Sequence, residues 1–396
     1  MKNSIIKTLN IDECYGCHAC EQICTHGAIS LVTNKDGFFY PTVDENKCIE
    51  CGLCEKVCPT KKANIQKLFH HKLDTVYAAW NHTLAERIQS TSGGLFYVLA
   101  SKIIEDGGVV YGVSYDPELL AFHKRVDTLD GLKDFRGSKY LQSNTKDTFN
   151  NVKTDLKNGI LVLYSGTPCQ IAALRLFLRK DYDNLFTVDL VCHGVPSPLI
   201  FKEHIKYIEE STKSKLVDFK FRAKKYSGWR SYVKYVYNKG NAKYLSVGMD
   251  SYFHFFNKAY LNRNSCFSCS FSSPQRVGDI TLSDFWGAER YSKTLRKERK
   301  YGFNLVMLNT NKALSLFNEI RGHIDTLELP FEYAYNGDIR LRESELKPEF
   351  RDIFYELYHE KGYPYVAEKY KYKSNLFNKC IPTFIKNIIR EIQSRL

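Results

Sequence analysis

Long apolar runs are missing from this sequence of 396 residues. No uncharged segment approaches the roughly 20 apolar residues that a membrane-spanning helix needs. The residues before Cys14 also lack the hydrophobic stretch of a secretion signal. These two absences argue against an integral membrane protein and against a secreted one, so we expect a cytoplasmic protein.

Sequence patterns for binding nucleic acids and nicotinamide cofactors are also missing. No RNP or helix-turn-helix pattern occurs, the lysines and arginines are dispersed, and no GxGxxG follows a strand-like segment. The net charge of +13, from 57 Lys and Arg against 44 Asp and Glu, still favours anionic partners. We therefore expect no nucleic acid, and we expect an acidic redox protein such as a ferredoxin or flavodoxin as partner.

Cysteine, in contrast, is abundant: there are 13, of which eight lie in two runs of the pattern C-x2-C-x2-C-x3-C near the N-terminus. The tight gaps turn three sulfurs of each run toward one point, and in two-cluster ferredoxins the fourth cysteine serves the other cluster. The predicted ligands are Cys14, Cys17, Cys20 and Cys58 for one [4Fe-4S] cluster and Cys48, Cys51, Cys54 and Cys24 for the other.

Two other uses of these eight cysteines agree less well with the spacing. Disulfide frameworks are typical of short secreted chains, and structural zinc sites use pairs of cysteines rather than runs of four. Pro59 follows the second run as the pattern expects, whereas Thr25 follows the first. This departure removes no ligand, so two clusters remain the prediction.

Beyond the cysteine runs, strand-like and helix-like segments alternate along the chain. Strand patterns occur at 76–80, 109–115, 160–166 and 185–192, and helix patterns begin at Leu95 and Leu199. This alternation predicts a layered α/β core with ligands in the loops that follow strands. We expect a small ferredoxin-like domain at 1–66, the α/β core at 67–290, and a charged, mostly helical region at 291–396. The polar basic stretch at 60–72 is interpreted as a linker.

The C-terminal end has the pattern of a basic amphipathic helix. Its apolar residues fall on one helical face: Ile381, Phe384, Ile385, Ile388, Ile389 and Ile392. Such a helix either makes peripheral contact with a membrane surface or packs on its own domain or on a second subunit. The sequence leaves both open.

Four of the remaining cysteines stand in contexts typical of loops. They are Cys169, Cys192, Cys266 and Cys269. A C-x2-C pair combined with two cysteines at strand ends has the residues for another four-thiolate site. Buried thiols without a ligand are the alternative, because free cysteine is a common core residue.

Six further motifs resemble the beta-subunit family of coenzyme F420 hydrogenase and dehydrogenase. They are ERIQSTSGG at 86–94, RGSKYLQS at 136–143, SGTPCQIAAL at 165–174, VDLVCHGVPSP at 188–198, FRAKKYSGW at 221–229 and CFSCSFSSPQRVGDITLSDFWG at 266–287. The resemblance implies a flavin, usually FAD, beside an iron–sulfur cluster. It also implies that the four loop cysteines hold this third [4Fe-4S] cluster and that a hydride carrier such as coenzyme F420 exchanges electrons with the flavin.

Candidate flavin ligands lie in two of these motifs. Thr91, Ser92, Gly93 and Gly94 precede a helix pattern, where amides and hydroxyls receive a phosphate or flavin edge, or simply cap the helix. Lys139 is a candidate to place positive charge beside the flavin N1 and O2 atoms, with a surface lysine as the alternative. His193 is a candidate proton relay or sulfur hydrogen-bond donor, and otherwise structural. Asp279 and Asp284 have two open roles, in ribose contacts or in capping a strand.

Together these patterns predict an iron–sulfur flavoprotein oxidoreductase. One-electron clusters and a flavin that accepts one or two electrons would couple the two kinds of redox chemistry. The substrate is not predicted, although relatives in this resemblance are associated with polysaccharide synthesis. The alternative is an electron-transfer subunit or assembly component without its own substrate pocket.

Overall fold

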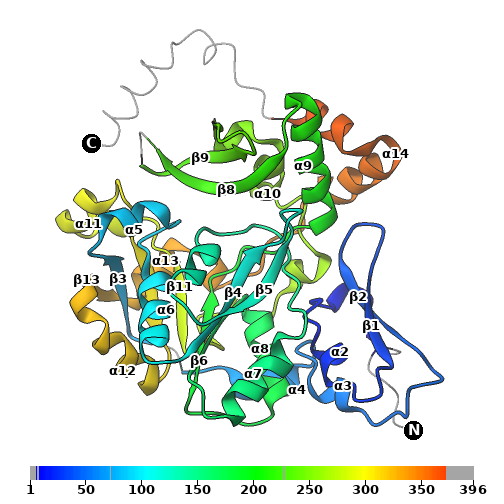
Figure 1. Ribbon diagram of the computed structural model, residues 1–396, viewed down its shortest axis with the longest axis horizontal. Coiled ribbons are helices and arrows are strands. Elements are labelled where there is room, and N and C mark those ends of the chain that lie inside the picture. The colour runs from blue at the N-terminus through cyan, green and yellow to red at the C-terminus, as the bar shows by residue number, and fades with distance from the viewer. Residues whose placement is uncertain (1–5, 7–8, 72, 226–227, 372–396) are drawn as a thin grey trace.

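The computed structural model describes residues 6, 9–71, 73–225 and 228–371. Its centre is a mixed sheet of eight strands (Figure 1). In spatial order these are β13 (Ile324–Pro330), β3 (Thr75–Asn81), β12 (Asn304–Leu308), β11 (Ile280–Asp284), β7 (Leu185–Leu190), β6 (Val162–Ser165), β4 (Val109–Tyr115) and β5 (Ala121–Val126). The four strands β11, β7, β6 and β4 are parallel, and the flanking pairs are antiparallel. The predicted layered α/β core is confirmed.

Helices cover both faces of this sheet because its central strands are apolar on both sides. In β4, for example, Val110 packs in one buried cluster and Val109 and Tyr111 in another. The first cluster includes α6 (Leu95–Glu105) and α12 (Asn311–Glu319), and the second includes α7 (Thr148–Lys157) and α8 (Pro168–Leu178). Parallel strands buried on both faces require such helical layers.

The N-terminal region is ferredoxin-like, as predicted. A two-stranded antiparallel sheet of β1 (Ile29–Thr33) and β2 (Phe39–Val43) accompanies short helices α2 (Ala19–Ile23) and α3 (Leu53–Lys56). This region lies beside α7 and α8 (Figure 1). Its buried apolar residues join the same core cluster as α8, so the region shares a core with the large sheet.

The stretch at 60–72 differs from the expected polar linker. Helix α4 (Lys62–Ile65) and the following turn bury Ile65 and Leu68 in the cluster around α8. The Arg175 side chain of α8 donates a hydrogen bond to the Leu68 carbonyl at 2.8 Å. Two apolar side chains in an otherwise basic stretch are sufficient to anchor this connection against the core.

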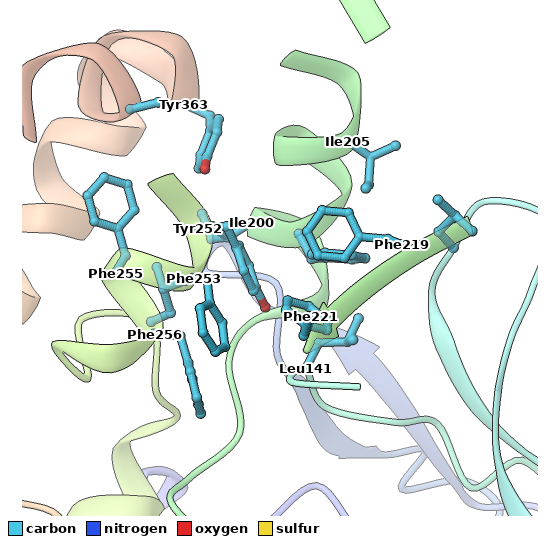
Figure 2. Close-up of a cluster of buried hydrophobic side chains, with 14 of the residues drawn as sticks. Leu141, Ile200, Ile205, Phe219, Phe221, Tyr252, Phe253, Phe255, Phe256 and Tyr363 are labelled. Atoms are coloured by element: carbon cyan, nitrogen blue, oxygen red, sulfur yellow. The ribbon is translucent and has the colours of Figure 1, made fainter. Parts of the chain in front are cut away.

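A second, three-stranded antiparallel sheet lies beyond one end of the strands of the large sheet (Figure 1). It consists of β8 (Leu216–Lys225), β9 (Gly228–Tyr237) and β10 (Ala242–Ser246), and packs with α9 (Pro198–Thr212), α10 (Ser251–Asn257) and α14 (Phe350–Tyr370). Figure 2 shows the aromatic centre of this unit, where Phe219 and Phe221 of β8 meet Tyr252 and Phe253 of α10. Ring pairs at 5 to 6 Å, such as Phe221 and Tyr252 at 5.8 Å, stabilise the packing.

The described region after residue 290 is mostly helical, as predicted, but it also contains two strands. The strands β12 and β13 complete the large sheet, so the core continues beyond the boundary expected at residue 290. β13 is an edge strand with exposed Asp325 and Glu328 among its buried positions, which explains why its charges suggested a helix. The longest helix of this region, α14, is kinked at Gly362.

The apolar face at 381–392 lies outside the described residues. Within the described part of the chain, no helix is both long enough and apolar enough to cross a membrane.

Candidate metal and cofactor sites

The first cysteine run forms a compact group with one cysteine of the second run. Burial raises the pKa of the Cys17 thiol well above its usual value, and negative charge at Cys58 and Cys14 adds to this rise. Burial also raises the pKa of Cys20, with further contributions from Cys17, Cys14 and Cys58. Cys58 therefore lies near Cys17 and Cys20 of the first run, as does Cys54 of the second, so the crossed assignment of ligands stays a prediction.

Backbone and hydroxyl groups donate to several of these sulfurs. The Gly16 N–H lies 3.3 Å from Cys14 Sγ, and the Ala28 N–H lies 3.3 Å from Cys24 Sγ. The Thr60 hydroxyl lies 3.1 Å from Cys58 Sγ. Hydrogen bonds of this kind stabilise thiolates and tune the potential of a bound cluster.

The second group, of Cys24, Cys48, Cys51 and Cys54, lies nearer to solvent. Cys51 is exposed and Cys48 half-buried, whereas Cys54 is buried. Cys54 packs in one small cluster with Cys24, Cys20 and Cys58, so the two groups are adjacent. We call the Cys14 group the inner set and the Cys24 group the outer set.

The four loop cysteines of the core converge on one pocket. Cys169 lies in the first turn of α8, Cys192 follows β7, and Cys266 and Cys269 lie in the loop before β11. All four line this pocket, together with Tyr15 of the N-terminal region. We call these four cysteines the core set. The sequence resemblance had implied this grouping of residues from three distant loops.

The thiols of the core set act on one another. Burial raises the pKa of Cys169 to about 12, and Cys269 adds to the rise. Burial likewise raises the pKa of Cys192 to about 11, where the Gly194 N–H acts in the opposite direction. A buried thiolate without a positive partner is costly. Their close grouping therefore fits cysteines that share a cationic ligand better than four inert core thiols.

Each sulfur of the core set has a hydrogen-bond donor. The Thr167 hydroxyl lies 3.2 Å from Cys169 Sγ. Backbone N–H groups donate to the other three, from Gly194 to Cys192, Val195 to Cys266 and Phe271 to Cys269. Such donors compensate the negative charge on thiolate ligands.

The spacing of the cysteines bears on the kind of metal centre. Within the described part of the chain, no three His, Cys, Asp or Glu side chains lie close enough together to hold a single metal ion. One zinc ion with Zn–S bonds of about 2.3 Å would need its sulfurs within about 4 Å of one another. A four-iron cubane binds each cysteine through a different iron, so its ligands stand farther apart. Four cysteines that line one pocket are the donor set that such a cluster takes.

The core set and the inner set are close neighbours. Cys169 contributes to the raised pKa of Cys17, and Cys17, Cys169 and Cys269 pack against the same buried cluster. Between them, the Tyr15 ring lies 5.5 Å from the Phe271 ring. The three cysteine sets therefore follow one another from the surface at Cys51 into the core.

The predicted flavin loop at 91–94 is largely used for internal contacts. The Ser92 hydroxyl donates to the Phe303 carbonyl at 2.8 Å, and Thr91 Oγ1 accepts the Ser138 N–H at 2.8 Å. A Cβ on Gly93 would lie 2.5 Å from the Ala79 carbonyl oxygen. Gly94 begins α6 with a φ of 83°, and the next N–H donates to Asn304. The loop thus joins the two sequence motifs predicted to bind flavin.

Lys139 stabilises its own loop. Its Nζ donates to the carbonyls of Asp134 at 3.1 Å and of Arg136 and Gly137 at 3.3 Å. Burial lowers the pKa of Lys139 to about 8. The ammonium group is therefore committed to backbone carbonyls rather than directed at the pocket of the core set.

Two basic residues that the sequence analysis did not assign lie beside the flavin loop. Lys224 Nζ donates to the Arg87 carbonyl at 2.7 Å and to the Ser92 carbonyl. Burial, followed by the charge of Arg87, lowers the pKa of Lys224 to about 7. Arg222 forms a buried ion pair with Asp284 at the end of β11. Basic residues at alternate positions of β8 were the available signal, since they share one face of the strand.

The remaining candidates have structural partners. His193 is half exposed and lies 3.4 Å from the Asp338 carboxylate, and its carbonyl accepts a hydrogen bond from Asn262. Asp279 accepts the Thr187 N–H at 2.8 Å and its hydroxyl at 2.6 Å. Asp279 therefore ties strand ends together, whereas Asp284 pairs with a cation near the flavin loop.

Comparison with known proteins gives matches over two parts of the chain. Residues 160–330 match the family model for the C terminus of the beta subunit of coenzyme F420 hydrogenase/dehydrogenase, and residues 13–62 match the 4Fe-4S dicluster domain. A comparison with curated protein sequences gave no match. A chain of the F420-reducing [NiFe] hydrogenase complex from Methanosarcina barkeri aligns over 76% of this chain and 93% of its own length, with 17% identity and a TM-score of 0.45.

These matches confirm the predicted pair of [4Fe-4S] clusters and the resemblance stated from the motifs. The family region starts just before β6 and ends with β13, so it includes all four cysteines of the core set. Residues 160–330 are thus similar to the C terminus of the coenzyme F420 hydrogenase/dehydrogenase beta subunit, and residues 13–62 match a 4Fe-4S dicluster domain.

Proposed function

We propose that this chain is an iron–sulfur flavoprotein oxidoreductase that passes electrons between three [4Fe-4S] clusters and FAD, and on to a hydride-accepting cofactor or substrate. The observation that carries the proposal is the direct succession of the inner and core sets. Tyr15 of the dicluster domain lines the pocket of the core set, and Cys169 of that set adds to the raised pKa of Cys17. A cluster domain that served only stability would not need to lie so close to the core set.

The proposed ligands follow the three cysteine sets. The inner and outer sets, within residues 1–66, hold one cluster each, and the core set of Cys169, Cys192, Cys266 and Cys269 holds the third. The core, which we proposed from sequence to begin at residue 67, supplies the pocket, and the N–H and hydroxyl donors around it stabilise the four thiolates. All four cysteines are partly buried, so the protein shields much of a bound cluster from water.

The proposed flavin site lies at the loop of residues 91–94 and the adjoining face of β8. Lys224 and Arg222 would place positive charge where a reduced flavin develops negative charge. Thr91 and Ser138 hold the two loop motifs together, so they position the site. Clusters transfer single electrons whereas a flavin exchanges one or two, and this difference makes the flavin the link to a hydride acceptor.

The outer set is the proposed contact point for an external redox protein. Cys51 is exposed, and Ile49 beside it is 61% exposed, so a partner can approach the cluster ligands closely. The net charge of +13 favours an acidic partner such as a ferredoxin or flavodoxin.

Anaerobic purification followed by iron, sulfide and flavin analysis tests this proposal. About twelve irons per chain, four for each cluster, and bound FAD are expected. Reduction of the clusters by a low-potential donor should then be followed by reduction of the flavin. A preparation with intact clusters that takes up no FAD would contradict the proposal and favour an electron-transfer subunit or assembly component.

A further inference from the structure

Arg263 lies between the dicluster domain and the loop that carries Cys266. Its side chain is completely buried, with 0% exposure. Its Nε donates to the Cys14 carbonyl, Nη2 donates to the Phe39 carbonyl at 2.8 Å, and Nη1 donates to Gln142 Oε1 at 3.3 Å. The guanidinium therefore binds the inner set's loop from across the domain junction.

The same residue is built into the core set. The Cys266 N–H donates to the Arg263 carbonyl at 3.0 Å, and the Arg263 N–H donates to the Val195 carbonyl at 3.0 Å. Val195 in turn supplies an N–H to the sulfur of Cys266. Arg263 also lines the pocket that the four cysteines of the core set share. One residue thus contacts both cysteine sets, the inner set through its guanidinium and the core set through its backbone.

The charge of Arg263 has no carboxylate partner among the residues that the structure describes. Its acceptors are two carbonyls and one amide, and the guanidinium lies 4.0 Å from the Tyr40 ring centroid. Other buried arginines of this chain do have acidic partners, since Arg276 pairs with Asp189 and Arg351 with Asp352. A buried charge without a counter-charge is strongly unfavourable.

Thiolate-bound clusters would supply the missing negative charge. A [4Fe-4S] core held by four thiolates is a net anion, and it gains a further negative charge when it is reduced. Arg263 binds the inner set's loop and lines the pocket of the core set, so its guanidinium would lie beside both clusters. A nearby positive charge favours the reduced form of a cluster and so raises its potential.

We propose that Arg263 is a positioning residue that serves as the shared counter-charge of the inner and core clusters, which raises the potentials of both and fixes the dicluster domain against the core. This inference rests on the proposed function. Gly16 agrees with it: a Cβ there would lie 3.0 Å from Arg263 Nη1 and 2.5 Å from Gln142 Nε2, so glycine leaves room for the contact.

Redox titration of the cluster-loaded full-length protein, followed by electron paramagnetic resonance, tests the charge directly. Arg263→Gln removes the positive charge but keeps N–H donors. Arg263→Lys keeps the positive charge but loses the planar, forked arrangement of guanidinium N–H groups. We expect the Gln variant to show at least a tenfold lower ratio of reduced to oxidised inner cluster at a fixed potential, equivalent to about 59 mV for a one-electron couple. The Lys variant should stay within about threefold of wild type, well under that tenfold step.

Arg351→Gln is the matched control. Arg351 is also buried, donates to the carbonyl of neighbouring Asn262 at 3.0 Å, and has Asp352 as its own partner. It therefore supports the same loop without serving as a counter-charge, and its loss should leave the inner-cluster potential unchanged.

Several outcomes would overturn the inference. Unchanged cluster potentials in Arg263→Gln would overturn it. Equal shifts of potential in the Gln and Lys variants would also overturn it, because the geometry of the guanidinium hydrogen bonds, and not the charge, would then be responsible. If the Gln variant fails to retain the inner cluster, iron analysis decides: retention in the Lys variant supports a charge role, and loss in both overturns it. Failure of the proposed function is distinguishable, since wild type would then hold about eight irons while the inner-cluster shift could still be measured.

Discussion

The phenol oxygen of Tyr15 accepts a hydrogen bond from the Ser270 N–H at 3.4 Å. Tyr15 follows the first ligand of the inner set, and Ser270 follows the last cysteine of the core set. Burial raises the pKa of Tyr15, and negative charge at Cys269 and Cys169 raises it further. This contact brings two cysteine motifs that are separated by some 250 residues of sequence into one buried region.

Replacing Gly16 should loosen the junction between the dicluster domain and the core. Gly16 has a φ of 61°, and a Cβ there would lie 2.5 Å from Gln142 Nε2 and 2.9 Å from the Phe39 carbonyl oxygen. Gly16→Ala should cost about 1–2 kcal/mol for the left-handed backbone and about 1–3 kcal/mol more for overpacking. The measurement is the free energy of unfolding in urea.

Gly27→Ala is the matched control for this substitution. Gly27 belongs to the same domain and has a φ of 58°, but nothing lies within 4 Å of its Cβ position. Gly27→Ala should therefore lower the free energy of unfolding only by the backbone contribution, about 1–2 kcal/mol. Equal losses in the two variants would contradict the close approach at Gly16.

Stability should fall in mild acid because of His123. Burial lowers the pKa of His123 to about 4, and its Nε2 lies 3.0 Å from the Ser165 carbonyl oxygen. The unfolded chain binds this proton near pH 6.5 and the folded chain only near pH 4, so stability is lost as pH falls through that window. Between pH 7 and pH 4.5 the wild type should lose about 2.5 kcal/mol more than His123→Gln.

Urea unfolding of the wild type and of His123→Gln at several pH values measures this difference. The glutamine cannot titrate, and the acid lability of the clusters affects both proteins alike. A difference in unfolding free energy that does not change with pH would show that His123 has the same pKa in the folded and unfolded states.

Electron exchange with an acidic carrier should depend on ionic strength. The net charge of +13 attracts an anionic partner over roughly 30 Å at 0.01 M salt but only about 3 Å at 1 M. Stopped-flow reduction by an acidic ferredoxin should slow as salt rises, whereas reduction by the small anion dithionite should change much less. Equal salt dependence for both reductants would remove the basis for protein docking.

Flavin binding should depend on Lys224 more than on Lys139. Lys224 Nζ donates to the Ser92 carbonyl beside the flavin loop, whereas the three acceptors of Lys139 Nζ lie in its own loop. Lys224→Met should weaken FAD binding about tenfold, or about 1.4 kcal/mol, and Lys139→Met should weaken it less. Titration of flavin-depleted protein with FAD, followed by fluorescence, compares them. A larger effect at Lys139 would restore the interpretation from sequence.

Local patterns explain which features the sequence revealed. The gaps within each cysteine run specify a cluster loop by themselves, and the apolar central strands such as β6 identify a buried parallel sheet. The strand β13 was missed because an edge strand alternates charged and buried residues. Its place in the sheet depends on pairing with β3, which lies some 250 residues earlier.

The direction of single side chains could not be predicted in the same way. Lys139 has the expected residue type, but its Nζ folds back onto carbonyls of its own loop. Arg263 carries no motif, and its acceptors at Cys14 and Gln142 come from distant segments. Residue type and spacing indicate chemistry, whereas partners are set by tertiary packing.

The most direct test of the central claim is the iron content of Cys192→Ala. Cys192 supplies one sulfur to the pocket of the core set and is remote in sequence from the dicluster domain. Full-length protein should hold about twelve irons per chain and the variant about eight, with the spectrum of the N-terminal pair intact and flavin reduction by those clusters slow. Wild-type iron content and normal electron transfer in Cys192→Ala would instead show that Cys192 is a buried thiol and that the core set holds no cluster.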